Sequence, residues 1–345
     1  MRPRCTQSGD ASTFDRVVVI GSSSGGVTAL LAITQALPPS FPAPICIVQH
    51  VGTQPSVLPE LLSYQRNNRA VHVVDGQRLA AGTIYVAPPD HHILVQGDIL
   101  HVTHGPKENH ARPAIDPLFR SAALSFGPRL IGVILTGQLD DGSAGLRAVK
   151  DCGGTTVVQD PATAAEPDMP LNAMAATQVD HCVPLVDIAP LLTRLAMEGA
   201  PSQRPKPPEH LRREVAINRG EAMLENLLAI ASPTLFTCPD CNGTLSEVAG
   251  ERPLRFRCHT GHAFSARTLE RLQADAAEEA MWNGVRALTE REMLLRRAAS
   301  VADALGDARQ QAAAQAQADR IQLQLEALKD LVANTDRPGH GDDAA

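Results

Sequence analysis

The sequence predicts an α/β protein: a three-layer, doubly wound, mostly parallel sheet with an antiparallel hairpin, followed by a small zinc-binding module and a helical C-terminal tail. Three observations support this fold class. Between residues 15 and 197, short runs rich in β-branched residues alternate with segments of helical periodicity. Three cysteines with the spacing of a zinc site follow a proline-rich stretch. Residues 267–333 contain few helix breakers.

Composition narrows the class of protein. The chain has 345 residues, of which 43% are apolar and 3% aromatic, so it can hold two domains with cores built from aliphatic side chains. A net charge of -7 argues against a general nucleic-acid-binding protein. The sequence contains neither a long apolar run nor an apolar N-terminal signal region. We therefore expect a cytoplasmic protein with no direct membrane insertion and with reduced cysteines.

The order of elements follows from the apolar pattern. Residues 1–14 are expected to be a disordered leader, and residues 15–197 an α/β domain. Its buried strands should lie at 17–20, 45–49, 71–74, 131–135, 155–158 and near 182–184, and its helices at 27–36, 118–125, 144–151 and 188–197. An antiparallel hairpin should run through 84–87, turn at 88–90 and continue at 92–95, before a second turn leads into 99–103.

The turn after the first strand has a sequence pattern that is typical of a nucleophilic serine. Residues 21–25 read Gly-Ser-Ser-Ser-Gly, the G-x-S-x-G pattern of a nucleophile elbow, which exposes the hydroxyl of the central Ser23. The N-terminus of the next helix offers free N–H groups for a developing oxyanion. The patterns of phosphate-binding and dinucleotide-binding loops are both missing. A plain turn rich in glycine and serine is the alternative interpretation, since five-residue patterns recur by chance.

Two further strand ends carry residues that could act with Ser23. The strand at 45–49 ends at His50, and the strand at 131–135 leads into Asp140 and Asp141. The carboxyl ends of parallel strands meet at one edge of a sheet. A serine hydroxyl needs a nearby base, and an acid orients that base. Singly, His50 could be an ordinary polar residue and Asp141 a turn residue; together, the three groups favour acyl-transfer chemistry.

Five sequence blocks resemble the catalytic domain of the chemotaxis receptor methylesterases, the CheB family, over residues 15–197. They lie in the family's order at 19–26, 48–50, 85–92, 112–123 and 135–142. The resemblance implies hydrolysis of γ-glutamyl methyl esters on chemoreceptor signalling helices with release of methanol, and deamidation of glutamine there. It implies no cofactor for the chemistry. The implied partner is a methylated chemoreceptor or a similar signalling helix.

The resemblance also implies roles for single residues. Ser23 is similar to the family's nucleophile, His50 to its general base and Asp141 to the acid that orients the base. The backbone N–H groups of Ser24 and Gln138 correspond to the oxyanion hole.

The chain departs from the family's pattern in two places. Met-Gly is common where Gln138 and Leu139 stand; only the backbone N–H of Gln138 is needed, whereas Leu139 replaces a glycine of the loop. Family members usually also carry a receiver domain of ~120 residues before the esterase. Because the matching blocks begin near residue 15, we expect activity that does not depend on aspartyl phosphorylation within this chain.

A cysteine module is expected at 233–266, after a linker at 198–232. Cys238 and Cys241 precede Cys258 with sixteen residues between, the spacing of a structural zinc site. His262 is the expected fourth ligand, because His259 directly follows Cys258 and would point to the other side of an extended chain. A redox C-x-x-C site would leave Cys258 unexplained. The module resembles the zinc-ribbon-like extensions of some stand-alone methylesterases. Because its cysteines lie beyond the proline-rich linker, we expect it to be separable from catalysis.

Residues 267–333 are expected to be a helical tail, and residues 334–345 to be disordered. An apolar stripe near the end of the tail has helical period and suits a helix packed on its own chain or a coiled coil with a partner; it comprises Ile321, Leu325, Leu328, Leu331 and Val332. The alternative function is a non-catalytic adaptor that binds receptors or partners through the esterase-like core and the zinc module.

Overall fold

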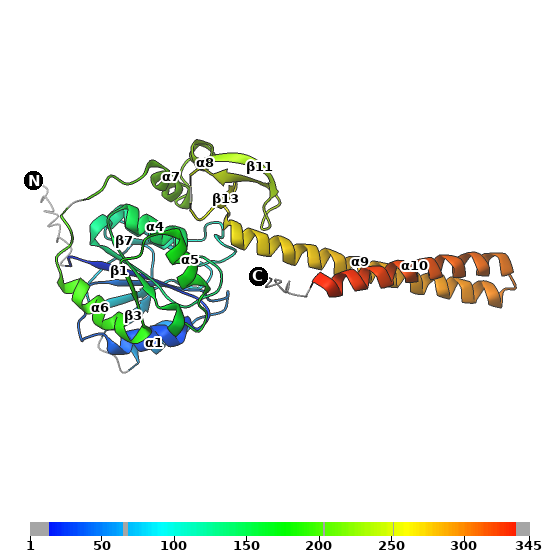
Figure 1. Cartoon of the computed structure of the whole chain (residues 1–345), viewed down its shortest axis with the longest axis horizontal. Helices are drawn as coiled ribbons and strands as arrows, with labels where there is room; N and C mark the ends of the chain where they lie inside the picture. Colours follow the sequence, from blue (N-terminus) through cyan, green and yellow to red (C-terminus); the bar gives the residue numbers. More distant parts are fainter. Residues whose placement is uncertain (1–13, 65–67, 203, 251, 336–345) are drawn as a thin grey trace, which may run out of the picture. The chain divides into compact units, whose positions relative to one another are not determined.

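The computed structural model describes residues 14–64, 68–202, 204–250 and 252–335, and the expected leader and C-terminal end therefore lie almost entirely outside it. The chain divides into two compact units (Figure 1). The first unit ends at Leu269 and the second begins at Glu270. The α/β domain and the cysteine module both belong to the first unit.

A sheet of seven parallel strands lies at the centre of the first unit, in the order β10-β9-β8-β1-β2-β5-β3. Its strands are β1 (Val17–Ser22), β2 (Ile45–Gln49), β3 (Arg69–His72), β5 (Thr83–Val86), β8 (Leu130–Ile134), β9 (Thr155–Gln159) and β10 (His181–Val183). Every residue of β1, β2 and β8 is buried, which explains their unbroken apolar sequences. The predicted doubly wound sheet is confirmed.

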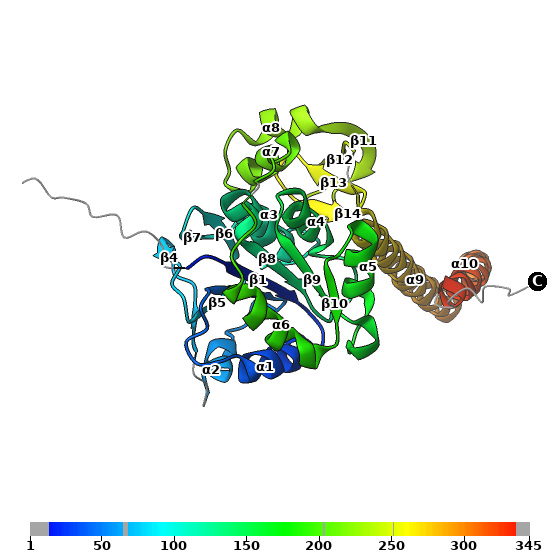
Figure 2. The same cartoon turned by 60° about the vertical axis from the view of Figure 1, so that its left-hand side comes forward.

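Helices cover both faces of this sheet, as Figure 2 shows. One face carries α1 (Gly26–Ala36), α2 (Leu58–Ser63) and α6 (Leu185–Met197), and the other carries α3 (Ile115–Phe126), α4 (Ser143–Asp151) and α5 (Asp168–Ala176). Two short 3₁₀ helices, η1 (Gly127–Arg129) and η2 (Pro161–Thr163), complete the connections. The sequence pattern did not reveal α2 or α5. Two apolar cores result, one on each face, and together they hold the strand ends in place.

The predicted hairpin is wrong in its first half. The strand at 84–87 is β5, which joins the parallel sheet between β2 and β3 instead of turning back on the next strand. The antiparallel pair is β6 (His92–Gln96) with β7 (Ile99–Thr103), and β4 (Gln77–Arg78) adds to β7. Ile84, Tyr85 and Val86 are buried in the sheet, and a small hairpin could not bury them as well.

The predicted linker at 198–232 also differs from the structure, because much of it is helical. It contains α7 (Glu209–Asn218) and α8 (Met223–Ile230). Pro208 stands directly before α7, where its missing N–H costs no hydrogen bond. Leu211 and Val215 of α7 are buried in the same apolar core as α3. The proline-rich stretch therefore ends at a helix that packs on the α/β domain.

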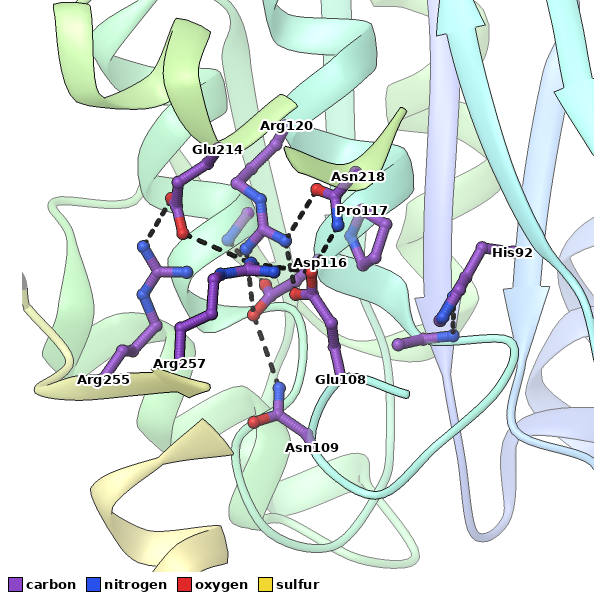
Figure 3. A network of polar contacts seen from close by, with 12 residues as sticks. His92, Glu108, Asn109, Asp116, Pro117, Arg120, Glu214, Asn218, Arg255 and Arg257 are labelled. Carbon is purple, nitrogen blue, oxygen red and sulfur yellow. Dashed lines mark hydrogen bonds and ion pairs between the residues drawn. The ribbon is translucent and has the colours of Figure 1, made fainter. Parts of the chain in front are cut away.

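The cysteine module is an antiparallel sheet of four strands, β11 (Ala231–Thr237), β12 (Thr244–Val248), β13 (Arg255–Cys258) and β14 (Ala263–Ser265). A buried ionic network joins it to the α/β domain (Figure 3). Glu108, before α3, accepts a hydrogen bond of 2.8 Å from Arg257 of β13 and is also paired with Arg120 of α3. Glu214 of α7 accepts one of 2.6 Å from Arg255.

These five charged side chains are nearly inaccessible to water, none being more than 4% exposed. Burial alone would raise the pKa of Glu108, but Arg120 and Arg257 hold that pKa well below its ordinary value. The carboxylate is therefore ionised and compensated. The module is docked on the domain through charges that would be costly to leave unpaired.

The second unit is a helical hairpin of α9 (Ala266–Ala304), whose first turn belongs to the first unit, and α10 (Ala308–Thr335). Arg296 of α9 donates a hydrogen bond of 2.7 Å to Gln322 of α10. Ile321, Leu325 and Val332 of the apolar stripe are buried within the chain, whereas Leu331 is exposed. Among the described helices, none combines the length and apolarity that a bilayer crossing requires.

Replacing Glu108 with Gln should destabilise the first unit by about 3–5 kcal/mol, because two buried guanidinium groups lose a compensating charge. Urea unfolding of the full chain measures the change. The control is Glu247→Gln, which alters an exposed carboxylate on β12 and should change the free energy of unfolding by less than about 0.5 kcal/mol. Equal stability of the two variants would contradict the role given to the buried network.

Candidate active site

Ser23 lies on the turn between β1 and α1, as predicted. The turn is tight, because Gly25 takes a left-handed conformation (φ 76°) and the N–H of Gly26 donates to the carbonyl of Ser23 at 2.8 Å. A Cβ atom on Gly26 would come within 2.2 Å of Gln49 Oε1, so the site requires glycine. Ser23 is only half-buried. The turn therefore presents its hydroxyl at the carboxyl edge of the sheet.

His50 and Asp141 lie beside this hydroxyl. His50 Nδ1 is 3.1 Å from Ser23 Oγ, and His50 Nε2 is 2.7 Å from Asp141 Oδ2. The three residues come from the ends of β1, β2 and β8, which are neighbours in the sheet. The structure thus brings together the three groups that the sequence predicted at three separate strand ends.

Gln49 holds two of these strand ends together. Its Oε1 accepts a hydrogen bond of 2.7 Å from Ser22 Oγ, and its Nε2 donates to the carbonyls of Ser23 (2.8 Å) and His50 (3.0 Å). Sequence reasoning gave Gln49 no role, although it stands inside one of the five blocks. Its position directly before His50, at the end of a buried strand, is the signal that could have revealed it.

The carboxylate of Asp141 is buried at the N-termini of two helices. Oδ2 accepts from the backbone N–H of Ile115 at 2.7 Å, at the start of α3, and Oδ1 accepts from that of Gly142 at 3.0 Å, just before α4. Oδ1 also accepts from Asn109 Nδ2 at 2.9 Å. Helix N-termini favour negative charge.

These donors determine the charge of Asp141 and the tautomer of His50. Burial raises the pKa of Asp141, but the hydrogen bonds from His50, Ile115 and Asn109 outweigh it, and the pKa lies below its ordinary value. An ionised carboxylate can only accept, so Nε2 of His50 carries a proton. In the neutral ring, the lone pair is then on Nδ1, which faces the hydroxyl of Ser23. The arrangement can remove a proton from Ser23.

Two further carboxylates surround the site, and sequence reasoning assigned a role to neither. Asp116 accepts from the N–H of Gly145 at 2.7 Å, and burial together with the charge of Asp141 raises its pKa to about 7. Asp140 accepts from Ser265 Oγ of β14 at 2.6 Å. The Ser265 contact spans 125 residues of sequence, so no local pattern could have revealed it.

The backbone N–H groups of Ser24 and Gln138 are the predicted donors of the oxyanion hole, and Gly137, the residue before Gln138, lies against Ser23. Among the described residues, no hydrogen bond uses either group as a donor, and both residues are exposed. Leu139 has a left-handed backbone (φ 61°), a conformation that costs an ordinary residue roughly 1–2 kcal/mol. Its carbonyl accepts from Asn172 Nδ2 at 2.7 Å, which helps to hold the loop. Leucine thus occupies a position whose left-handed backbone suits glycine.

The predicted metal ligands also lie together. The ligand atoms of Cys238, Cys241, Cys258 and His262 are within 4.8 Å of one another. Cys241 Sγ is 3.7 Å from Cys258 Sγ, which is 3.5 Å from His262 Nδ1. A tetrahedral zinc ion with bonds of about 2.3 Å to sulfur and about 2.0 Å to nitrogen needs separations of about 3.8 and about 3.5 Å. These two separations match such an ion, so the cluster could hold zinc, and His259 is not part of it.

The α/β domain of this chain is similar to known proteins. The model of the CheB methylesterase family matches residues 18–192. A putative protein-glutamate methylesterase/protein-glutamine glutaminase of Leptospira interrogans is 40% identical over 184 residues, covering 52% of this chain and 93% of that protein. Protein-glutamate methylesterase/protein-glutamine glutaminase 4 of Anaeromyxobacter dehalogenans is 39% identical over 201 residues, covering 55% of this chain and 54% of that protein.

The chain is also similar to a solved structure of this family. The crystal structure of the Thermotoga maritima CheB methylesterase catalytic domain superposes with a TM-score of 0.50 and 34% identity, covering 52% of this chain and 98% of that chain. The chain thus spans nearly all of the Leptospira protein but about half of the Anaeromyxobacter protein. The family match ends before the cysteine module begins. Over its α/β domain, this chain belongs to the CheB methylesterase family.

Proposed function

We propose that this chain hydrolyses γ-glutamyl methyl esters on chemoreceptor-type signalling helices and releases methanol. The observation that carries the proposal is the continuous contact from Ser23 through His50 to Asp141 in a chain of the CheB family. The names of the relatives support a protein-bound glutamyl ester as substrate, and they also support deamidation of glutamine as a second activity. No cofactor takes part in the proposed chemistry.

The proposed mechanism follows from the tautomer of His50. Its Nδ1 takes the proton of Ser23 Oγ while that oxygen attacks the ester carbonyl, and the carboxylate of Asp141 stabilises the charged ring. The oxyanion is stabilised by the backbone N–H groups of Ser24 and Gln138. His50 then protonates the departing methoxide. Water attacks the acyl-enzyme in the same way, which releases the glutamate carboxylate and restores Ser23.

A non-catalytic adaptor is the competing function, and the geometry favours the esterase over it. Binding a receptor helix needs no histidine within hydrogen-bond distance of a serine. It also needs no buried carboxylate aligned behind the ring, and burying that charge is costly.

We also propose that the cysteine module binds one structural zinc ion, held by Cys238, Cys241, Cys258 and His262. Three thiolates and one imidazole close a tetrahedral shell and leave no position for a catalytic water. The ion would contribute folding energy to a sheet too small to fold on its own core. Such a site needs reduced thiols, so we place the protein in the cytoplasm. We assign residues 15–197 to the catalytic domain.

Ser23→Ala and His50→Ala should each lower methanol release from methylated receptor membranes by several orders of magnitude, because the triad acts as one unit. Both variants should keep the unfolding midpoint of the wild type. Ser202→Ala, which alters an exposed serine after α6, is the matched control and should be fully active. Near-normal hydrolysis by Ser23→Ala would overturn the proposed mechanism.

Replacing Cys238 and Cys241 together by Ser should release about one zinc ion per chain, since two of the four ligands are lost. Elemental analysis of the purified full chain measures the metal. The control is His259→Ala, which should keep its zinc because His259 lies outside the ligand cluster. Loss of zinc from His259→Ala, with retention in His262→Ala, would show that the ligand set is wrong.

A further inference from the structure

The end of the cysteine module contacts the catalytic loops directly. We call residues 263–268 the bridge segment; it comprises β14 and the first turn of α9, and it lies within the first compact unit. The carbonyl of Ala263 accepts from the N–H of Asn109 at 2.8 Å. Ser265 Oγ and Thr268 Oγ1 donate to Asp140 Oδ1 at 2.6 and 3.2 Å. The bridge segment thus holds the residue directly before the triad acid.

Asn109 links the bridge segment to Asp141 itself. Its Oδ1 accepts from the backbone N–H of Ser265 at 2.9 Å, and its Nδ2 donates to Asp141 Oδ1 at 2.9 Å. The two neighbours determine the orientation of the amide, because a backbone N–H can only donate and a carboxylate can only accept. Asn109 has φ 50°, a left-handed conformation that asparagine tolerates better than most residues. The Asn109 side chain therefore connects the module to the triad acid through two hydrogen bonds.

A second chain of hydrogen bonds connects the bridge segment to the loop that contains Gln138 and Leu139. Arg267 Nη1 donates to Asn172 Oδ1 at 2.9 Å, and Asn172 Nδ2 donates to the carbonyl of Leu139 at 2.7 Å. Leu139 has the unfavourable left-handed backbone described above, so its conformation needs support from its surroundings. Gln138, whose backbone N–H is proposed to bind the oxyanion, directly precedes Leu139.

The buried ionic network strengthens the same junction. Glu108, which anchors Arg257 of the module, directly precedes Asn109 in the chain. Figure 3 shows Asn109 beside this network. Its Nδ2 also donates to Asp116 Oδ2 at 3.4 Å. A shift of the module would therefore move Glu108 and Asn109 together, and Asp141 would lose a donor.

We propose that Asn109 and the bridge segment are positioning elements for Asp141, so that the esterase is competent only while the cysteine module is folded and docked. This inference rests on the proposed function and adds a form of control to it. It also reverses the expectation, drawn from the proline-rich sequence, that the module is separable from catalysis. Loss of the zinc ligands would then switch off an active site to which they contribute no atom.

Asn109→Asp tests whether Asn109 positions Asp141 or only attaches the module to the α/β domain. It keeps an acceptor for the Ser265 amide, but it loses the donor to Asp141. In the full chain, we expect kcat for p-nitrophenyl acetate to fall about tenfold or more, less than the roughly 10⁴-fold loss that follows disabling a triad acid. KM should stay within about twofold, because Asn109 touches no substrate. The control, Thr234→Ala, removes a hydroxyl bonded only within the module and should match the wild type.

Cys258→Ser tests whether loss of a zinc ligand in the module affects the active site. We expect kcat to fall about as much as in Asn109→Asp. Hydrogen exchange gives a second measurement that does not depend on activity, and we expect amide exchange across residues 139–143 to become faster in Cys258→Ser. If Asn109→Asp does not fold, Ser265→Ala replaces it, because it removes the hydroxyl that donates to Asp140 and accepts from the N–H of Thr268 within the bridge segment.

The outcomes distinguish this inference from the proposed function. Retention of kcat by Cys258→Ser and Asn109→Asp, while Ser23→Ala is inactive, would overturn the inference and leave the esterase intact. Hydrolysis by Ser23→Ala equal to that of the wild type would overturn the proposed function. In that case hydrogen exchange alone would test whether the module is coupled to the residues around Asp141. Unchanged exchange at residues 139–143 in Cys258→Ser would reject that coupling.

Discussion

The carboxylate of Asp141 is buried between the starts of α3 and α4, where backbone N–H groups and His50 compensate its charge. A charge in this position would be very costly without those donors. Because it stays ionised, it fixes the proton of His50 on Nε2 and leaves Nδ1 facing Ser23. The order of β1, β2 and β8 in the sheet matters for function because it delivers three side chains to one place.

The cysteine module extends this constraint beyond the α/β domain. A docked module that shared only surface contacts could separate without disturbing the site. Here Arg257 and Glu108 are buried together, so separation would leave charges uncompensated. Asn109 follows Glu108 and touches Asp141. Packing of the module and alignment of the triad are thus parts of one arrangement.

Much of this could be predicted from the sequence, because buried strands and the turns after them have strong local patterns. The positions of Ser23, His50 and Asp141 followed from strand ends, and the four clustered ligands from their spacing. The placement of β5 could not be predicted, because the same apolar run suits a hairpin or a parallel strand. The role of Asn109 could not be predicted either, because its partners are 32 and 156 residues away in sequence.

The central claim is that Ser23 is a nucleophile activated by His50. Mass spectrometry of the full chain after treatment with a fluorophosphonate tests it directly, because such reagents attach to activated serine hydroxyls. We predict one adduct per chain, located on Ser23 and lost in His50→Ala. An adduct on another residue, or labelling of Ser23 that persists without His50, would contradict the account.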